Sequence, residues 1–293
     1  MLSDLLSLLW APFLMCLVLT GIHAYLGIHV IAREIVFVDI AMAQIAALGA
    51  TVAFLLGWAT DAWQSYAGAL AATLVGSVVL ALTRSRRRQV SQEAVIGVVY
   101  AVSAAAAVLV ADRAPHGAEQ VRSMLVGNLL SVAPLEVARV AGLYALVGAL
   151  HWLCRRPFFL ITTDPAAAYA AGWRVRLWDF LFYASFGVVV ASSVRIAGVL
   201  LVFSYLIVPA LAGIALGGSL GTRLMIGWAF GAAVSVLGIT GSAALDTPTG
   251  ATVVCAFGAA LVVLWLLAPA ARYRAAAAAA REPASVRDKE TVR

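Results

Sequence analysis

The amino-acid sequence predicts an all-α, polytopic helical membrane protein with about nine transmembrane helices. Hydrophobic residues make up 63% of the 293 residues, charged residues only 12%, and the mean hydropathy is +0.99. A soluble domain has roughly 45–50% apolar and about 25% charged residues. This apolar excess is too large for one soluble core, so the chain needs membrane lipid as its solvent.

Each expected span has close to the ~20 apolar residues that a helix needs to cross the hydrocarbon core. We expect membrane helices at residues 5–29, 37–57, 64–83, 93–111, 135–154, 177–194, 196–216, 223–243 and 250–268. The transmembrane domain is therefore placed at residues 1–268, and residues 269–293 are expected to form a mobile cytoplasmic tail. Residues 113–134 contain too short an apolar run to span and are expected to form an outward re-entrant or interfacial piece.

Arginine clusters set the expected orientation, because basic residues concentrate in cytoplasmic loops. With about nine spans, three such clusters lie on the same side of the membrane, and the N-terminus lies outside. The net charge of +6 needs no other explanation, so no nucleic-acid partner is expected. The clusters are Arg84, Arg86, Arg87 and Arg88; Arg155, Arg156, Arg174 and Arg176; and Arg272, Arg274 and Arg281.

Two polar residues stand out in the second apolar stretch, which reads VDIAMAQIAALGATVAFLLG. Asp39 and Gln44 are its strongly polar groups. A carboxylate at the centre of a membrane helix costs roughly 2.5–3.5 kcal/mol on insertion scales, so such residues usually face a bundle interior or a water-filled path. We therefore take Asp39 and Gln44 as candidates for the lining of a transport pathway.

A cytoplasmic segment at residues 155–176 reads RRPFFLITTDPAAAYAAGWRVR. Asp164 followed by Pro165 is typical of a helix N-cap and first helical position, and Gly172 suits the end of that helix. The pattern predicts a helix of about two turns, including Tyr169, that lies outside the membrane. Such a helix suits docking into a groove of a partner protein; the alternative is a plain connecting loop.

The sequence gives no sign of catalytic machinery. Lys289 is the single lysine, so no glycine-rich GxxxxGK[ST] phosphate-binding loop is present and any ATP hydrolysis must occur on a separate subunit. GxSxG and HExxH elements are also absent. Cys16, Cys154 and Cys255 have no zinc-site spacing, and His23 and His29 lie on different faces of one helix. We expect no enzymatic activity and no permanently bound cofactor.

A proline interrupts the stretch from Arg195 to Gly217. Pro209 lies within an expected span, where it frees a backbone carbonyl and kinks the helix. Ser204 and Tyr205 lie about one turn earlier. A kink beside polar groups can line a pathway, and a purely structural kink is equally common.

These segments together resemble the integral-membrane permease of bacterial zinc, manganese and iron ABC importers. The resemblance extends from Leu26 to Leu267 and is carried by the order and spacing of several segments. They read AQIAALGATVAFLLG, EAVIGVVYAVSAAAAVLV, LVGNLLSV, TTDPAAAYAAGW, VRIAGVLLVFSYLIVPALAGIALG and LDTPTGATVVCAFGAALVVLWL.

The resemblance implies a multi-pass permease in the bacterial inner membrane that forms a homodimer and binds two cytoplasmic ABC ATPase subunits. ATP would bind on those partners. An extracytoplasmic metal-binding protein would deliver the transported divalent metal. The helix from Pro165 to Gly172 would be the coupling helix that contacts the ATPase.

The second span departs from the family's pattern. The family commonly carries an aspartate and a histidine there, in an arrangement like GDAxSH. In this chain Ile40 occupies the aspartate position and Gln44 the histidine position, whereas Asp39 lies one residue earlier, about 100° around a helix. Asp39 is the candidate metal ligand. Two alternatives to a free-metal importer stay open, a permease for a metal chelate such as a siderophore or cobalamin-like ligand, and an ion-driven secondary transporter.

Overall fold

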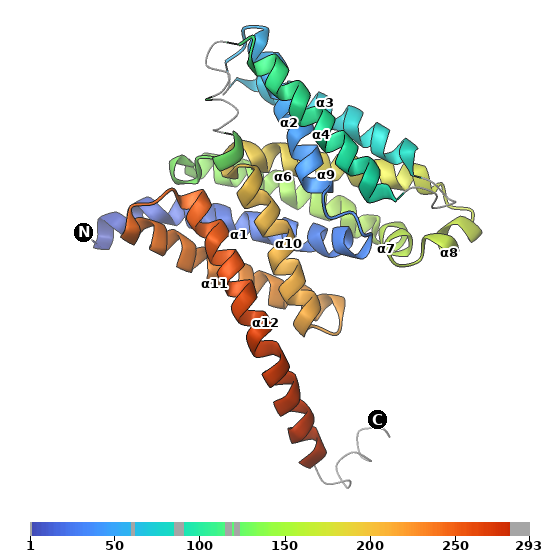
Figure 1. The fold of residues 1–293 in the computed structure, drawn as a ribbon, viewed down its shortest axis with the longest axis vertical. Coiled ribbons are helices and arrows are strands. Elements are labelled where there is room, and N and C mark those ends of the chain that lie inside the picture. The colour runs from blue at the N-terminus through green and yellow to red at the C-terminus, as the bar shows by residue number, and fades with distance from the viewer. Residues whose placement is uncertain (1, 60–61, 85–90, 115–118, 120–123, 282–293) are drawn as a thin grey trace.

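The computed structural model describes residues 2–59, 62–84, 91–114, 119 and 124–281, with side chains described from Leu9 to Leu267. Within these residues the fold is all helical (Figure 1). The helices are α1 (Leu2–Ala32), α2 (Val38–Leu55), α3 (Trp63–Thr83), α4 (Gln92–Ala111), η1 (Leu129–Ser131), α6 (Pro134–Leu153), α7 (Arg155–Thr163), α8 (Pro165–Ala170), α9 (Val175–Ala197), α10 (Val199–Leu216), α11 (Leu220–Leu245) and α12 (Thr249–Arg281).

The number of spans agrees with the sequence prediction of about nine. In the described part of the chain, eight helices are long and apolar enough to cross a membrane. A ninth span results if α6 and α7 are counted together, although the two helices meet at a bend of 74°. The prediction of an all-α polytopic membrane protein is therefore confirmed.

The spans form two groups joined by α9. In one group α2 packs against α3 and α4, and in the other α1 packs against α10, α11 and α6 (Figure 1). Helix α9 contacts α3 and α2 on one side and α6 and α10 on the other. Because α9 touches both groups, any rearrangement of one group relative to the other must involve it.

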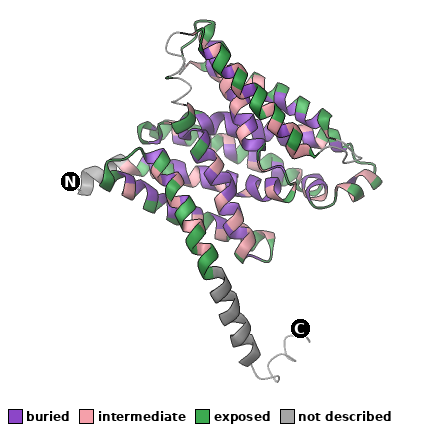
Figure 2. Ribbon diagram, viewed as in Figure 1, coloured by how far each residue is buried: buried purple, intermediate pink, exposed green. Residues whose placement is uncertain are grey.

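Burial identifies α9 and α1 as the centre of the bundle. Of the most apolar window of each span, 72% is buried in α9 and 67% in α1, against 11% in α12 (Figure 2). Exposed leucine and valine side chains cover the outer faces of α3, α4, α6 and α12. Lipid is a favourable solvent for such faces.

Small residues allow α2 and α3 to pack very closely. A Cβ atom added to Gly49 would lie 2.4 Å from the carbonyl oxygen of Gly68 and 2.7 Å from the Cβ of Ala72. Gly76, one turn further along α3, accommodates the side chain of Ile45. The backbones of the two helices therefore lie in direct contact along this stretch.

Contacts between the segments that connect the helices define two opposite ends of the bundle. At one end, the backbone N–H of Asn128 donates to the carbonyl of Ile196, and Gly250 lies against the carbonyl of Val126. The sequence segment expected to be re-entrant contains η1 at this end, although residues 115–118 and 120–123 lie outside the described ranges. At the opposite end, the connections near Arg33, Arg84 and Thr162 meet.

The predicted division of the chain after residue 268 falls within α12, whose backbone is helical as far as Arg281. Residues 282–293, which include Lys289, lie outside the described residues, so the predicted mobile tail stays a prediction.

Candidate functional site

The helix expected from Pro165 to Gly172 is present as α8, with the caps that the sequence indicated. A side-chain oxygen of Asp164 accepts from the backbone N–H of Ala167 at 2.9 Å, and Pro165 occupies the first helical position. Gly172 has a φ of +75°, and its N–H donates to the carbonyl of Tyr169. Such a left-handed residue, which glycine adopts without penalty, is typical of a helix C-terminus.

The connecting segment contains a second helix that the sequence prediction missed. Helix α7 precedes α8 and buries Pro157, Phe158, Ile161 and Thr162 against the bundle. Because a residue before proline disfavours the helical conformation, Asp164 is extended (φ −144°) and separates the two helices. The helical spacing of Phe158, Ile161 and Thr162 was the available signal.

Helix α8 rests on α7 and on the start of α9. Ala168 of α8 forms a small apolar cluster with Ile161 and Val175. Ala166 and Ala170 on its other side are exposed. The segment is thus attached to the bundle by one face and presents small side chains on the other.

A buried ion cluster lies beside this segment and joins the ends of three membrane helices. Oδ1 of Asp179, in α9, is 3.0 Å from Nη1 of Arg33 and 2.7 Å from Nη1 of Arg84. Arg33 follows α1 and Arg84 follows α3. The side chain of Asp179 is 0% exposed and that of Arg33 3% exposed, against 18% for Arg84. We call these three residues the Asp179 cluster.

The charges of the Asp179 cluster do not balance, since one carboxylate faces two guanidinium groups. The guanidinium carbon of Arg33 also lies 3.9 Å from the centroid of the Phe182 ring, a favourable cation–π position. Burial lowers the pKa of Arg33, and the neighbouring Asp179 carboxylate acts to raise it. In the described part of the chain, Nη2 of Arg33 and Oδ2 of Asp179 have no hydrogen-bond partner.

Thr162 links the Asp179 cluster to α7. Its Oγ1 lies 2.9 Å from Nε of Arg33 and 2.9 Å from Nδ1 of His29. The same hydroxyl donates to the carbonyl of Phe158 at 2.7 Å. The ion cluster and the α7–α8 segment are therefore in direct hydrogen-bond contact.

Further polar groups follow the interface of α1, α6 and α9 into the bundle. His151 contacts the hydroxyls of Ser185 at 2.8 Å and Tyr25 at 3.3 Å. Deeper in the bundle, Nε2 of His23 lies 3.1 Å from the hydroxyl of Ser193, which is 2.6 Å from that of Tyr144. These pairs satisfy buried polar atoms, and each His contacts hydroxyl groups rather than a second metal ligand.

Asp39 is buried but lies near the end of its helix rather than in the middle. It occupies the first turn of α2 and is 0% exposed. Met42, one turn later on the same face, reaches Gly187 of α9, so the Asp39 carboxylate lies on the side of α2 turned toward α9. Among the described residues, neither of its oxygens has a hydrogen-bond partner. The positive end of the helix dipole favours a carboxylate there.

Gln44 is half-buried and lies on a different face of α2 from Asp39. Five residues correspond to about 500° of helix rotation, so Gln44 lies about 140° around α2 from Asp39. The structure thus keeps both residues on α2 but does not bring their side chains together.

Glu93, at the start of α4, forms a hydrogen bond at the same end of α2. One of its carboxylate oxygens accepts from the backbone N–H of Phe37, the residue before α2, at 3.0 Å. Two carboxylates, Asp39 and Glu93, are therefore associated with the first turn of this helix.

The three candidates on α10 lie in its packed interior. Ser204 donates to the carbonyl of Leu200 at 3.0 Å, and the hydroxyl of Tyr205 lies 2.7 Å from that of Ser235 in α11. Pro209 is buried within α10, and its carbonyl approaches Gly227 of α11. A role for these residues in a pathway stays a prediction.

No preformed metal centre occurs in the part of the chain that the structure describes. There, no group of three or more His, Cys, Asp or Glu side chains converges in a way that could hold a metal ion. Asp39 is therefore not part of such a group, and its role as a pathway contact stays a prediction.

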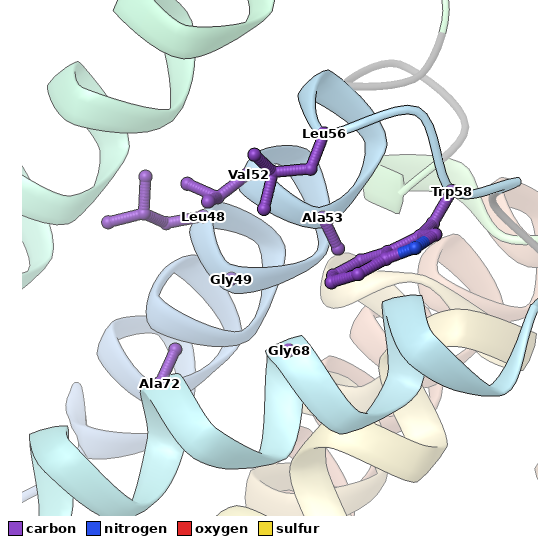
Figure 3. Close-up of a pocket in the computed structure, with 8 residues that line it drawn as sticks. All are labelled: Leu48, Gly49, Val52, Ala53, Leu56, Trp58, Gly68 and Ala72. Atoms are coloured by element: carbon purple, nitrogen blue, oxygen red, sulfur yellow. The ribbon is translucent and has the colours of Figure 1, made fainter.

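An apolar groove of about 390 Å³ lies between α2 and α3, at the end of α2 away from Asp39. In Figure 3 the Trp58 side chain lies beside Ala53, and no charged side chain lines the groove. This composition suits an apolar occupant rather than a cation. The lining residues are Leu48, Gly49, Val52, Ala53, Leu56, Trp58, Gly68 and Ala72.

The residues that sequence reasoning missed are those of the Asp179 cluster and Thr162. Asp179 lies in a stretch that reads RLWDFLFY, so it is a carboxylate among apolar residues just as Asp39 is. That signal was available from the sequence. Its two arginine partners were not, because they lie 146 and 95 positions away along the chain.

The fold defines the class first: a polytopic helical membrane protein in which two short helices, α7 and α8, lie in sequence between the long helices α6 and α9. Residues 6–268 match the family model described as the ABC 3 transport family. The chain belongs to that family. The resemblance noted in the sequence is thereby confirmed.

Several relatives are similar over most of their length. The manganese transport system membrane protein MntC of Halalkalibacterium halodurans is 23% identical over 83% of this chain and 82% of its own. A probable iron transport system membrane protein of Haemophilus influenzae is 25% identical over 85% of this chain and 86% of its own.

Two solved structures share the fold. PsaBC from Streptococcus pneumoniae, in complex with a Fab, superposes with a TM-score of 0.76 at 20% identity and covers 93% of this chain and 98% of that chain. An ABC transporter described as of the metal-chelate type, in an inward-facing conformation, gives a TM-score of 0.64 at 16% identity and covers 87% and 85%.

Proposed function

We propose that this protein is the membrane-spanning permease subunit of an ATP-driven metal-ion importer. The observation that carries the proposal is the match of residues 6–268 to the ABC 3 transport family, with relatives named for manganese and iron transport. The bundle supplies the membrane path. The chain performs no ATP hydrolysis itself, in keeping with its single lysine at position 289.

The α7–α8 segment is the docking element for a cytoplasmic ABC ATPase, which binds the ATP. Its position supports this assignment, because it lies at the same end of the bundle as Arg33 and Arg84, the end that positive residues mark as cytoplasmic. The exposed Ala166 and Ala170 allow close approach of a partner groove. Asp164, Pro165, Tyr169 and Gly172 fix the shape of α8 for this contact.

The complete importer contains two permease copies in the bacterial inner membrane and an extracytoplasmic metal-binding protein. The resemblance to metal-importer permeases supports both partners. The metal-binding protein docks at the end formed by residues 126–128, 196–198 and the start of α12.

Asp39 is the proposed pathway contact for the cation. Its buried carboxylate has no described partner and lies toward the cytoplasmic end of α2. A carboxylate without an imidazole companion favours Mn²⁺ over softer ions, because oxygen ligands suit manganese. Gln44 adds an amide oxygen on a different face of the same helix.

Transport of a metal chelate is the second candidate. The observation that favours it is the lack, within the described residues, of a cluster of metal ligands. A chelate brings its own ligands and needs a wider path but no ionic contact.

Uptake by cells separates these functions. Cells that lack their own metal importers receive this permease with its cognate ATPase and binding protein, and accumulation of free Mn²⁺, Zn²⁺ and Fe²⁺ is compared with that of a ferric siderophore and cobalamin. Free-ion uptake that falls in Asp39→Asn but not in the exposed control Asp112→Asn supports the proposal. Chelate uptake alone, or full free-ion uptake by Asp39→Asn, overturns the assigned cargo or the assigned contact.

A further inference from the structure

We infer that the Asp179 cluster, linked to α7 through Thr162, passes movement of the α7–α8 segment to α3 and α2 during transport. Arg33, Arg84, Thr162 and Asp179 are thus positioning residues for coupling. The inference rests on the proposed function, because it assigns parts to the step that joins ATP use in a partner to movement of the spans.

The first link is Thr162, whose hydroxyl makes all three hydrogen bonds that it can form. A threonine hydroxyl has one hydrogen to donate and two lone pairs to accept. Because it donates to the carbonyl of Phe158, it accepts from Nε of Arg33 and from Nδ1 of His29, which fixes the hydrogen of that imidazole on Nδ1. Thr162 therefore ties α7 to the end of α1 through two separate donors.

The second link is Arg33, which its hydrogen bond to Thr162 couples to movement of α7. Its side chain is 3% exposed, so water does not take the place of a lost hydrogen-bond partner. The guanidinium group also stays charged at any physiological pH. Losing Thr162 would leave a buried Nε–H unpaired, which is unfavourable. Displacement of α7 therefore either moves Arg33 with it or strains the contact.

The third link is Asp179, which two helices share. Its Oδ1 accepts from both Arg33 and Arg84, so movement of Arg33 changes the contact that holds the end of α3. Helix α3 packs tightly on α2 at Gly49 and Gly68, and α2 carries Asp39. A continuous series of contacts thus connects the proposed ATPase docking element with the proposed pathway residue.

Helix α7, which carries Thr162, is itself packed against α8. Ala168 of α8 packs against Ile161 of α7, the neighbour of Thr162. A push on α8 by a bound partner therefore reaches α7 without an intervening flexible loop, since Asp164 alone separates the two helices.

The neighbouring threonine provides a matched control. Thr163 is exposed, and its hydroxyl donates to the carbonyl of Phe159 at 2.9 Å. Thr162→Val and Thr163→Val make the same chemical change at adjacent positions of one helix, but the first alone removes the hydroxyl that Arg33 and His29 contact. Thr162→Ser keeps that hydroxyl.

The experiment measures Mn²⁺ taken up per ATP hydrolysed, with the permease and its cognate ATPase in proteoliposomes and the binding protein supplied outside. Thr162→Val is expected to lower this ratio at least about tenfold, because loss of a hydrogen bond to a charged group costs a factor of about ten or more, while ATP hydrolysis continues. Thr162→Ser and Thr163→Val are expected to keep the wild-type ratio. A purely structural role would instead lower uptake and hydrolysis together.

A second variant breaks the series at its other end. Arg84→Gln removes one arginine from Asp179 and leaves Arg33 paired, and its partial exposure favours folding. The double variant Thr162→Val/Arg84→Gln is expected to match the more severe single variant, because both act on one route, whereas independent effects would multiply.

The inference is overturned if Thr162→Val has the wild-type ratio, or if Thr163→Val is equally impaired. Should Thr162→Val fail to assemble, a wild-type ratio in Arg84→Gln overturns it. Failure of the proposed function has a different signature, which is absence of ATP-dependent Mn²⁺ uptake by the wild-type complex.

Discussion

Nη1 of Arg84 lies 2.7 Å from Oδ1 of Asp179 and joins the end of α3 to the start of α9 across 95 positions of the chain. The same carboxylate oxygen also holds Arg33. This shared contact connects the two groups of helices at the end of the bundle where the α7–α8 segment lies.

Asp179→Asn is expected to destabilise the protein strongly. Removing the negative charge leaves two guanidinium groups close together, one of them almost completely buried, and breaking a buried pair costs about 3–5 kcal/mol. The measurement is the midpoint of thermal unfolding in detergent. Glu136→Gln is the control, because the Arg195–Glu136 pair is 46% and 32% exposed and its loss should cost less than about 1 kcal/mol. Equal midpoints for the two variants would contradict the structural role.

Asp39→Asn is expected to lower transport without lowering the stability of the protein. The Asp39 carboxylate is buried without a described hydrogen-bond partner, so neutralising it removes a desolvation penalty and should raise the unfolding midpoint or leave it unchanged. Uptake of Mn²⁺ should nevertheless fall, because the cation loses its carboxylate contact. A large drop in the unfolding midpoint would show that Asp39 is a structural group instead.

Asp164→Ala is expected to weaken ATPase binding, because it removes the side chain that caps α8. Loss of an N-cap costs about 1 kcal/mol of helix stability, which corresponds to about a fivefold loss of affinity if α8 must be folded to bind. Asn is an equally good cap, so Asp164→Asn should bind normally. The measurement is the dissociation constant of the purified ATPase for the permease in nanodiscs. Wild-type affinity in Asp164→Ala would argue against docking at α8.

Gly49→Ala is expected to separate α2 from α3. The added Cβ would lie 2.4 Å from the carbonyl oxygen of Gly68, and backbone cannot yield cheaply, so the cost should be about 1–3 kcal/mol. Gly97→Ala in α4 is the control, since no atom lies within 4 Å of its added Cβ, and alanine favours a helix over glycine. Thermal unfolding of the two variants should therefore shift in opposite directions.

Much of the fold follows from local sequence patterns. Runs of about 20 apolar residues locate the spans, and Asp164, Pro165 and Gly172 locate α8 because caps are local chemistry. Helix α7 was missed because its apolar face is short and mixed with polar residues. The bend of 74° between α6 and α7 was also not apparent, since a bend depends on what each helix packs against.

The candidate site was less accessible to sequence reasoning. Asp39 could be recognised as a carboxylate in an apolar stretch, but its position in the first turn of α2 depends on where the helix begins. The Asp179 cluster brings together residues 33, 84, 162 and 179, and only tertiary packing makes them neighbours. Sequence spacing carries no information about such contacts.

The central claim is tested most directly by ATP-dependent Mn²⁺ uptake into proteoliposomes that contain the purified permease with its cognate ABC ATPase, with the metal-binding protein supplied outside. The account predicts uptake that requires ATP hydrolysis and both partners, and none with the permease alone. Uptake of Mn²⁺ by the permease alone, driven by an ion gradient without ATP, would contradict it.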